Sequence, residues 1–190
     1  MKRPGSHFIN FAFFQALWFA CILGAARDRV WPGLALLGCF MLWQLWPGRR
    51  ARGDVGLILI CAAIGLLVDT LWIRFGLIHY RAAVPYADWA PLWIVALWIT
   101  LGLTLNHSLA WLRRYVWASV ALGAIGSPLS YFAGSRLGAA ELPADLTWSM
   151  LAFSLSWAIL VPALVYLGSK MSDERGIYNS ISRQDAKAPR

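Results

Sequence analysis

Charged residues are scarce in this sequence. Asp, Glu, Lys and Arg make up 14% of its 190 residues, whereas about 25% is usual in soluble globular domains. Apolar residues reach 59%, against roughly 45–50% in such domains. So few charges could not cover the surface of a water-soluble domain of this size. The composition therefore excludes an ordinary soluble domain and indicates a protein whose solvent is the lipid bilayer.

Common catalytic and metal-binding motifs are also missing. There is no G-x-S-x-G elbow, H-E-x-x-H pair, Walker motif or dinucleotide fingerprint. The three cysteines, Cys21, Cys39 and Cys61, form no C-x-x-C pair and have no His at metal-ligand spacing. We therefore predict no metal site and no cofactor, and we interpret the cysteines as small buried hydrophobes.

Long apolar runs are what the sequence does contain. A membrane-spanning helix needs about 20 mainly apolar residues, and lipid offers no partner for free backbone groups, so helices must carry the runs. The sequence predicts an all-α bundle of six transmembrane helices at Phe8–Ala26, Val30–Trp46, Val55–Phe75, Trp89–Leu109, Tyr115–Ala133 and Thr147–Gly168. The first run is longer than the ~7–15 apolar residues of a cleaved signal peptide, so we expect it to be retained.

The basic residues predict the orientation of these spans. With the N-terminus inside, twelve of the 17 Lys and Arg residues fall on the cytoplasmic side, as the positive-inside rule requires. Both termini are then cytoplasmic, with a transmembrane domain at 1–169 and a polar, partly disordered tail at 170–190. The charges lie at the ends of apolar runs rather than in a basic patch, so the net charge of +8 does not indicate nucleic-acid binding.

Asp69 is the most informative single residue. It lies about 21 Å from the cytoplasmic entry of its span, where an acid is costly unless it is paired or hydrated. Gly65, Ala62 and Ile58 share its helical face, so this face is expected to meet protein. One interpretation is a proton relay, a substrate-binding carboxylate or a catalytic acid–base group. The other is a structural carboxylate that pairs with Arg74, Arg136 or His79.

The fourth span carries a polar stripe. At 100° per residue, the side chains within about 40° of one line are Trp93, Thr100, Thr104, His107 and Trp111. The stripe could line a polar cleft in which His107 transfers protons. Alternatively, the threonine hydroxyls bond to their own helix carbonyls and His107 lies at the inner interface. Asn106 points away from this line and is kept as a candidate substrate-binding residue.

Small residues mark one face of the fifth span. Ser119, Gly123, Ser127, Ser130 and Gly134 lie along it, and such faces let helices approach closely in lipid. Pro128 removes a backbone donor and predicts a kink. The face is either plain packing or the wall of a cavity at the depth of Asp69, with Tyr131 and Trp72 shaping the pocket.

Three stretches carry a family resemblance. They are 103–112 (LTLNHSLAWL), 126–134 (GSPLSYFAG) and the third span with Asp69. They resemble an uncharacterised family of bacterial inner-membrane proteins, domain of unknown function 2878. The resemblance covers nearly the whole chain before the tail. It implies a multi-pass protein of the inner membrane without an established reaction, and a loose link to fatty-acyl modification.

Three classes of function remain open. In the first, the protein is an enzyme or enzyme subunit in membrane-lipid or fatty-acyl modification, whose substrate enters from the bilayer. Its catalytic residues would be Asp69, His107 and Tyr131, and its substrate-binding residues Trp72, Trp93, Thr100, Thr104, Asn106 and Ser127. In the second, it is a small proton-coupled transporter or flippase. In the third, it is an accessory subunit with a membrane-protein partner.

Overall fold

The computed structural model describes residues 5–185 and is all-helical apart from one two-residue ribbon. The elements in chain order are α1 (Gly5–Ala25), α2 (Trp31–Gln44), α3 (Asp54–Arg74), β1 (His79–Tyr80), α4 (Leu92–Leu105), the 3₁₀ helix η1 (Ala110–Arg114), α5 (Val116–Ala121), the π-helical turn η2 (Leu122–Gly126), α6 (Ser127–Arg136), β2 (Ala140–Glu141) and α7 (Thr147–Asp185). The all-α prediction is confirmed.

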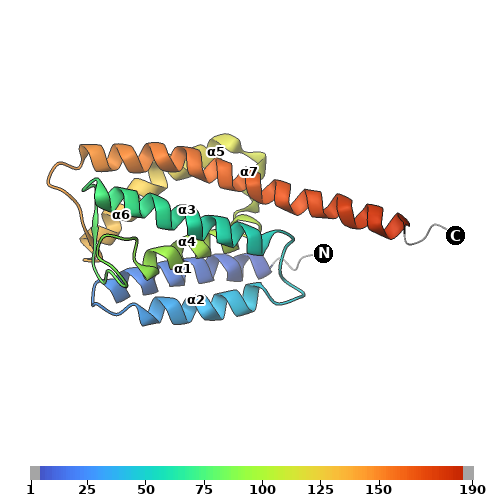
Figure 1. Ribbon diagram of the computed structural model, residues 1–190, viewed down its shortest axis with the longest axis horizontal. Helices are drawn as coiled ribbons and strands as arrows, with labels where there is room; N and C mark the ends of the chain where they lie inside the picture. Colours follow the sequence, from blue (N-terminus) through green and yellow to red (C-terminus); the bar gives the residue numbers. More distant parts are fainter. Residues whose placement is uncertain (1–4, 186–190) are drawn as a thin grey trace.

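The long segments run back and forth along one axis. In Figure 1, α1, α2, α3, α4, the α5–α6 segment and α7 cross the molecule in alternating directions. The start of α1 and the end of α7 therefore lie toward the same end. At the opposite end, β1 and β2 pair antiparallel, with His79 opposite Glu141. This ribbon ties the loop after α3 to the loop before α7.

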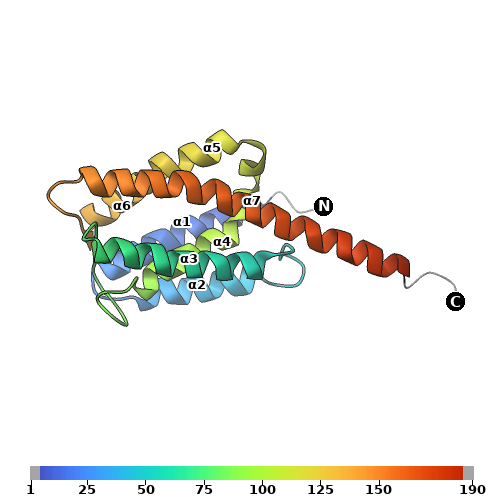
Figure 2. The same cartoon turned by 45° about the horizontal axis from the view of Figure 1, so that its top comes forward.

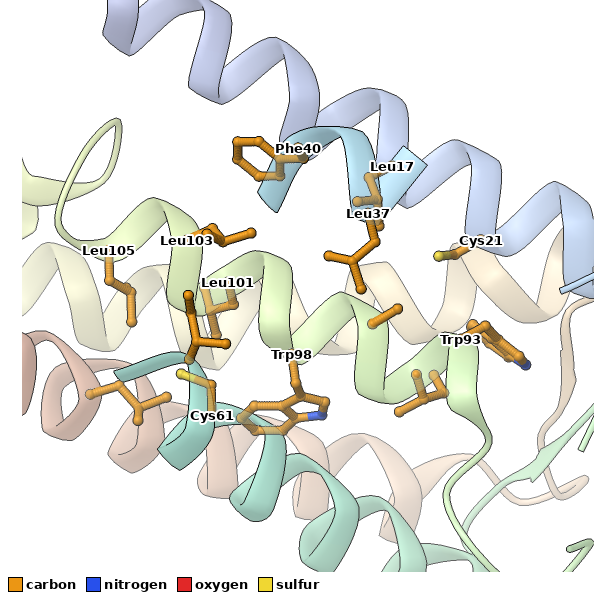
Figure 3. Close-up of a cluster of buried hydrophobic side chains, with 14 of the residues drawn as sticks. Leu17, Cys21, Leu37, Phe40, Cys61, Trp93, Trp98, Leu101, Leu103 and Leu105 are labelled. Carbon is orange, nitrogen blue, oxygen red and sulfur yellow. The ribbon is translucent and has the colours of Figure 1, made fainter. Parts of the chain in front are cut away.

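Helix α4 lies at the centre of the bundle. Every residue from Thr100 to Leu105 is buried, as expected for a helix that is apolar on all sides. It packs against α1, α2 and α3. A Cβ on Gly102 would lie 3.0 Å from the Cα of Ile58 on α3, so the absent side chain lets these two helices approach closely. Figure 3 shows α4 side chains Trp98, Leu101 and Leu103 directed into this core.

Four segments of the described chain are long and apolar enough to cross a membrane: α1, α3, Val116–Arg136 and Thr147–Ser172. This agrees with a membrane-spanning protein. Helices α2 and α4 have 14 residues each, or about 21 Å at 1.5 Å per residue, less than the ~30 Å hydrocarbon core. Length alone therefore does not establish six spans.

The fifth predicted span is a helix with an internal irregularity. The predicted kink corresponds to the π-helical turn η2, which directly precedes the Ser127–Pro128 start of α6. Proline lacks the N–H that would continue the α-helical bonding, and a π turn absorbs one extra residue at such a point.

Helix α7 continues beyond the predicted end of its span. It remains helical past Gly168 to Asp185 and extends beyond the bundle (Figure 1). The predicted domain boundary at residue 170 is therefore not marked by a break in the helix. The last five residues of the predicted tail, 186–190, lie outside the described part of the chain.

Candidate functional site

Asp69 is fully buried near the end of α3. Gly65 and Ile58, on the same helical face, are also buried, so that face meets protein, as predicted. The predicted ionic partners are absent from the site: Arg74 pairs with Asp88 instead, and no salt bridge joins Asp69 to any other described residue. The structural ion pair considered from the sequence is therefore replaced by another arrangement.

Three aromatic side chains donate hydrogen bonds to the Asp69 carboxylate. Trp98 Nε1 lies 2.7 Å from Oδ2. Tyr131 Oη lies 3.2 Å from Oδ1, and the Tyr80 hydroxyl bonds to the same oxygen. An ionised carboxylate is an acceptor only, so it accommodates three donors. Neutral donors thus solvate this acid in the place of water or of a cation.

Tyr80 lies in β1, outside the membrane-spanning helices. Burial raises the pKa of its phenol well above the ordinary value, and the nearby Asp69 carboxylate raises that pKa further, because a second negative charge would be repelled in a poorly solvated place. Tyr80 therefore retains its proton and remains a donor to Asp69.

The position of Trp98 depends on the glycine at position 65. A Cβ on Gly65 would lie 2.1 Å from Cγ of Trp98, so the indole occupies the space that any larger residue would take. On its other side, Trp98 stacks on Trp157 of α7, with ring centroids 4.5 Å apart. The indole is thus held between α3 and α7 with its N–H on Asp69.

Tyr131 is held by a separate aromatic cluster. Its ring lies 4.5 Å from that of Phe153 and 5.3 Å from that of Trp72, and both partners are buried. Trp72 therefore contacts the Tyr131 ring and helps to hold it in place. It does not itself line the adjacent cavity.

A cavity of about 540 Å³ lies in front of this site. The hydrogen-bond donors of Asp69 form part of its wall, while Asp69 lies behind them. No Asp, Glu, Lys, Arg or His belongs to the described lining. Along α1 the wall runs from Phe11 to Ile22, about 16 Å at 1.5 Å per residue. The cavity is therefore elongated and mainly apolar, with polar side chains near Tyr80 and Tyr131 and at Gln15 of α1.

The cavity separates two groups of helices. Figure 2 shows α5, α6 and α7 on one side and α1, α2, α3 and α4 on the other. Across it, Trp18 Nε1 of α1 donates to Ser130 Oγ of α6 at 2.9 Å. Exposed apolar side chains of the same wall, among them Phe19 and Leu129, border the cavity on the outer surface of these helices. The small-residue face thus serves both purposes considered from the sequence. Gly123 packs against the Trp157 backbone, and Ser127 lines the cavity.

A second buried polar cluster lies at the other end of α3. Asp54 is 1% exposed. Its Oδ2 accepts from His107 Nε2 at 2.9 Å and from the Ala51 N–H at 2.7 Å, and its Oδ1 accepts from Asn106 Nδ2 at 2.9 Å. Asn106 Oδ1 in turn accepts from Arg113. The start of α3 is therefore joined to the end of α4.

Gln44 and Asn10 extend this cluster to α2 and α1. Gln44 Nε2 lies 3.3 Å from His107 Nδ1 and 3.2 Å from His107 Nε2, so the amide contacts the imidazole at both ring nitrogens. Asn10 Nδ2 donates to Gln44 Oε1 at 2.7 Å and to the Leu103 carbonyl at 3.0 Å, and Ser108 Oγ donates to Asn10 Oδ1 at 2.6 Å. Four helices are thus connected by side chains that are buried, apart from the half-buried Ser108.

The predicted catalytic residues do not form one site. Asp69 and Tyr131 are in contact, whereas His107 lies with Asp54, about 22 Å away along α3 at 1.5 Å per residue. Of the predicted substrate-binding residues, Trp93 and Ser127 line the cavity. Thr100 and Thr104 bond to the carbonyls of Ala96 and Leu101 in their own helix and do not line it. The polar stripe therefore forms no cleft.

Several site residues have no clear signal in the sequence. Trp98 is an ordinary residue of an apolar run until the fold brings it to Asp69. From the sequence, Tyr80 is one of four outer-loop residues, with His79, Arg81 and Asp88, that could supply a partner or form an ordinary solvated connection. Asp54 directly follows the basic segment 49–53, so the sequence suggests that its carboxylate lies in a solvated loop. Asn10 and Gln44 could have been noticed as lone amides inside predicted spans, where polar side chains need partners.

Comparison with known proteins gives a family without an activity. The sequence profile of the family described as "Protein of unknown function (DUF2878)" matches residues 7–163, which include Asp69 and both polar clusters. No curated protein and no solved structure matches the chain significantly.

Proposed function

Because the chain belongs to the DUF2878 family, whose function is unknown, we propose a function from the geometry of the Asp69 site. The protein binds the apolar chain of a membrane lipid in the cavity and acts, as an enzyme or enzyme subunit, on the polar end of that chain. The single observation that carries this proposal is a buried carboxylate bonded to two tyrosine hydroxyls in the wall of an elongated apolar cavity.

The form of the cavity supports a lipid substrate. Its volume of about 540 Å³ lies within the ~300–1,000 Å³ of typical small-molecule sites. Its length along α1 suits an extended chain better than a compact polar molecule. The gap between α1 and α6 offers a lateral route from the bilayer, with the Trp18–Ser130 bond across it.

Asp69 and Tyr131 supply the chemistry. The Tyr131 hydroxyl donates to Asp69, so its oxygen lone pairs can accept a proton from a hydroxyl group of the substrate. As that proton arrives, the phenolic proton moves to Asp69, and the reverse transfer returns it. Tyr131 is the catalytic residue in this scheme, while Asp69 is the proton acceptor that positions it.

The membrane arrangement belongs to the same proposal. We infer six spans with both termini in the cytoplasm of a bacterial inner membrane. The alternating direction of the segments (Figure 1) and the excess of Lys and Arg at the end with both termini support this orientation. At the opposite end, Arg74 and Arg81 are paired with Asp88 and Asp28, which reduces the net charge there.

A proton-coupled transporter or flippase is the second candidate. It is favoured by two buried carboxylates, Asp54 and Asp69, at opposite ends of α3. It ranks lower because buried Leu57, Cys61 and Leu101 fill the space between them. An accessory subunit that stabilises a membrane-protein partner would use both clusters only for packing.

The test is whole-cell lipid mass spectrometry on a strain that lacks the gene. We expect a lipid species to change on deletion, and wild-type protein to restore it. Asp69→Asn and Tyr131→Phe, expressed at matched levels, should reduce the restoration at least tenfold. Asn keeps the size of Asp69 but loses its charge, and Phe removes only the Tyr131 hydroxyl.

Tyr166→Phe is the matched control, because Tyr166 is exposed on α7 and should restore the lipid fully. Identical lipid profiles in the deletion and wild-type strains would contradict the enzyme proposal. Proton-coupled flux in liposomes that is lost in Asp69→Asn would instead favour the transporter. A stable partner on gentle solubilisation, together with an unstable Asp69→Asn protein, would favour the accessory subunit.

A further inference from the structure

The polar groups in the cavity wall differ in whether they already have partners. Trp93 Nε1 donates to the Arg81 carbonyl at 3.0 Å, and Trp18 Nε1 donates to Ser130. Trp98, Tyr80 and Tyr131 donate to Asp69. Two buried atoms of this wall make no hydrogen bond within 3.5 Å to the described residues: Ser127 Oγ, and Trp157 Nε1, which faces the Tyr131 hydroxyl at a longer distance.

The unpaired Ser127 hydroxyl is exceptional in this protein. Serines in membrane helices usually bond to a carbonyl one turn back, and Ser119 and Ser135 do so here. For Ser127 the carbonyl three residues back belongs to Ala124, and it already accepts from Ser154 of α7 at 2.8 Å. The Ser127 hydroxyl bonds neither to this carbonyl nor to any other described group, although the residue is only 8% exposed.

The two unpaired groups lie close to the Asp69 site. Ser127 and Tyr131 are four residues apart on α6, so they share one face. Trp157 stacks on Trp98, the donor to Asp69. Both groups can donate to an oxygen atom, and a buried donor without a partner is costly. An occupant with an acceptor oxygen would satisfy them at the polar end of the cavity.

The wall also limits the charge of the occupant. A phosphate or carboxylate is recognised by Arg, Lys or a cluster of backbone N–H groups, and no basic side chain belongs to the described lining. The nearest charge is the Asp69 carboxylate behind the tyrosines, which would repel an anion. A charged head group inside the cavity would therefore remain uncompensated.

From these observations we propose that the substrate is a single-chain lipid that ends in an uncharged hydroxyl group. Its oxygen bonds to Ser127 and Trp157, and its chain extends along α1 between α1 and α6. This inference rests on the proposed function, because it specifies the substrate of the same site.

The test measures binding to the full-length protein in nanodiscs with tritiated hexadecanol as the probe. Unlabelled methyl palmitate and hexadecyl phosphate serve as competitors with the same chain. We expect methyl palmitate to compete at least tenfold better than hexadecyl phosphate. Ser127→Ala and Trp157→Phe should each weaken hexadecanol binding about fivefold, since each removes one hydrogen bond and little volume.

Ser135→Ala is the matched control, because Ser135 lies on α6 outside the cavity wall and its hydroxyl is bonded to its own helix. It should bind hexadecanol as the wild type does. Equal or tighter binding of hexadecyl phosphate would overturn the inference, as would unchanged affinity in both Ser127→Ala and Trp157→Phe.

The outcomes separate this inference from the proposed function. If hexadecyl phosphate is preferred while Asp69→Asn still abolishes the lipid change in cells, the neutral substrate class is wrong and the enzyme proposal stands. If neither probe binds and no lipid changes on deletion, both are wrong.

Discussion

Asp54→Ala is expected to lower the free energy of unfolding by about 3–5 kcal/mol, because each buried donor left without an acceptor costs roughly 1–3 kcal/mol. The substitution leaves three groups without an acceptor: His107 Nε2, Asn106 Nδ2 and the Ala51 N–H. It also removes an acid from the first turn of α3, where the helix dipole favours negative charge. Since this cluster joins α3 and α4, the loss should loosen the whole end of the bundle.

Thermal unfolding of purified protein in detergent measures this effect. At roughly 2–4 °C per kcal/mol for a chain of this size, the Tm should fall by about 10 °C. Asp88→Ala is the matched control. Its pair with Arg74 has an N···O distance of 3.8 Å and side chains 57% and 68% exposed, so it contributes below about 1 kcal/mol. Equal melting of the two variants would mean that the Asp54 cluster is not a structural link.

Gly65→Ala is expected to be the second large disruption. The new methyl group would lie 2.1 Å from the Trp98 ring, so the indole must leave its position between α3 and α7. Overpacking of this kind costs about 1–3 kcal/mol. Loss of the Trp98–Asp69 bond leaves a buried carboxylate with one donor fewer, at roughly another 1–3 kcal/mol. We therefore expect lower stability together with loss of the lipid activity.

The control is Gly38→Ala in the middle of α2. A Cβ at Gly38 meets nothing within 4 Å, and Ala is the better helix former by roughly 0.5–1 kcal/mol. Gly38→Ala should therefore leave Tm unchanged or raise it, whereas Gly65→Ala lowers it. If Gly65→Ala and Gly38→Ala changed Tm in the same direction and by the same amount, the packing of Trp98 on Gly65 would not contribute to stability as proposed.

The positions of the helices could be predicted closely from sequence. The predicted Val55–Phe75 corresponds to α3 at Asp54–Arg74, and Tyr115–Ala133 corresponds to the α5–α6 segment at Val116–Arg136. The fourth span was predicted too long. The chain turns at Asn106, where α4 ends, and the remaining predicted residues up to Leu109 form turns that lead into η1. The apolar content of a segment predicts that a helix is present, but it does not predict the residue at which that helix ends.

The candidate site could be predicted only in part. Asp69 was found because an acid deep in an apolar run needs an explanation, and Tyr131 was placed at its depth. Tyr80 was considered only among the outer-loop residues that could supply a partner, Trp98 was not found, and the basic partners considered do not contact Asp69. Asp54 was missed because it directly follows a charged loop. A carboxylate at such a position is expected to be solvated, so it does not stand out in the sequence as Asp69 does.

The sequence by itself determined that lipid is the solvent of this protein, which segments are helical, and at which residues a polar group is out of place. These properties depend on sums over neighbouring residues and on the cost of desolvating one side chain. The tertiary structure alone decided that Trp98, Tyr80 and Tyr131 solvate Asp69, and that Asp54 pairs with His107. The choice of partner depends on how each helix is rotated and shifted against its neighbours. That arrangement is set by the packing of all the helices together, through contacts such as Gly65 with Trp98 and Gly123 with Trp157.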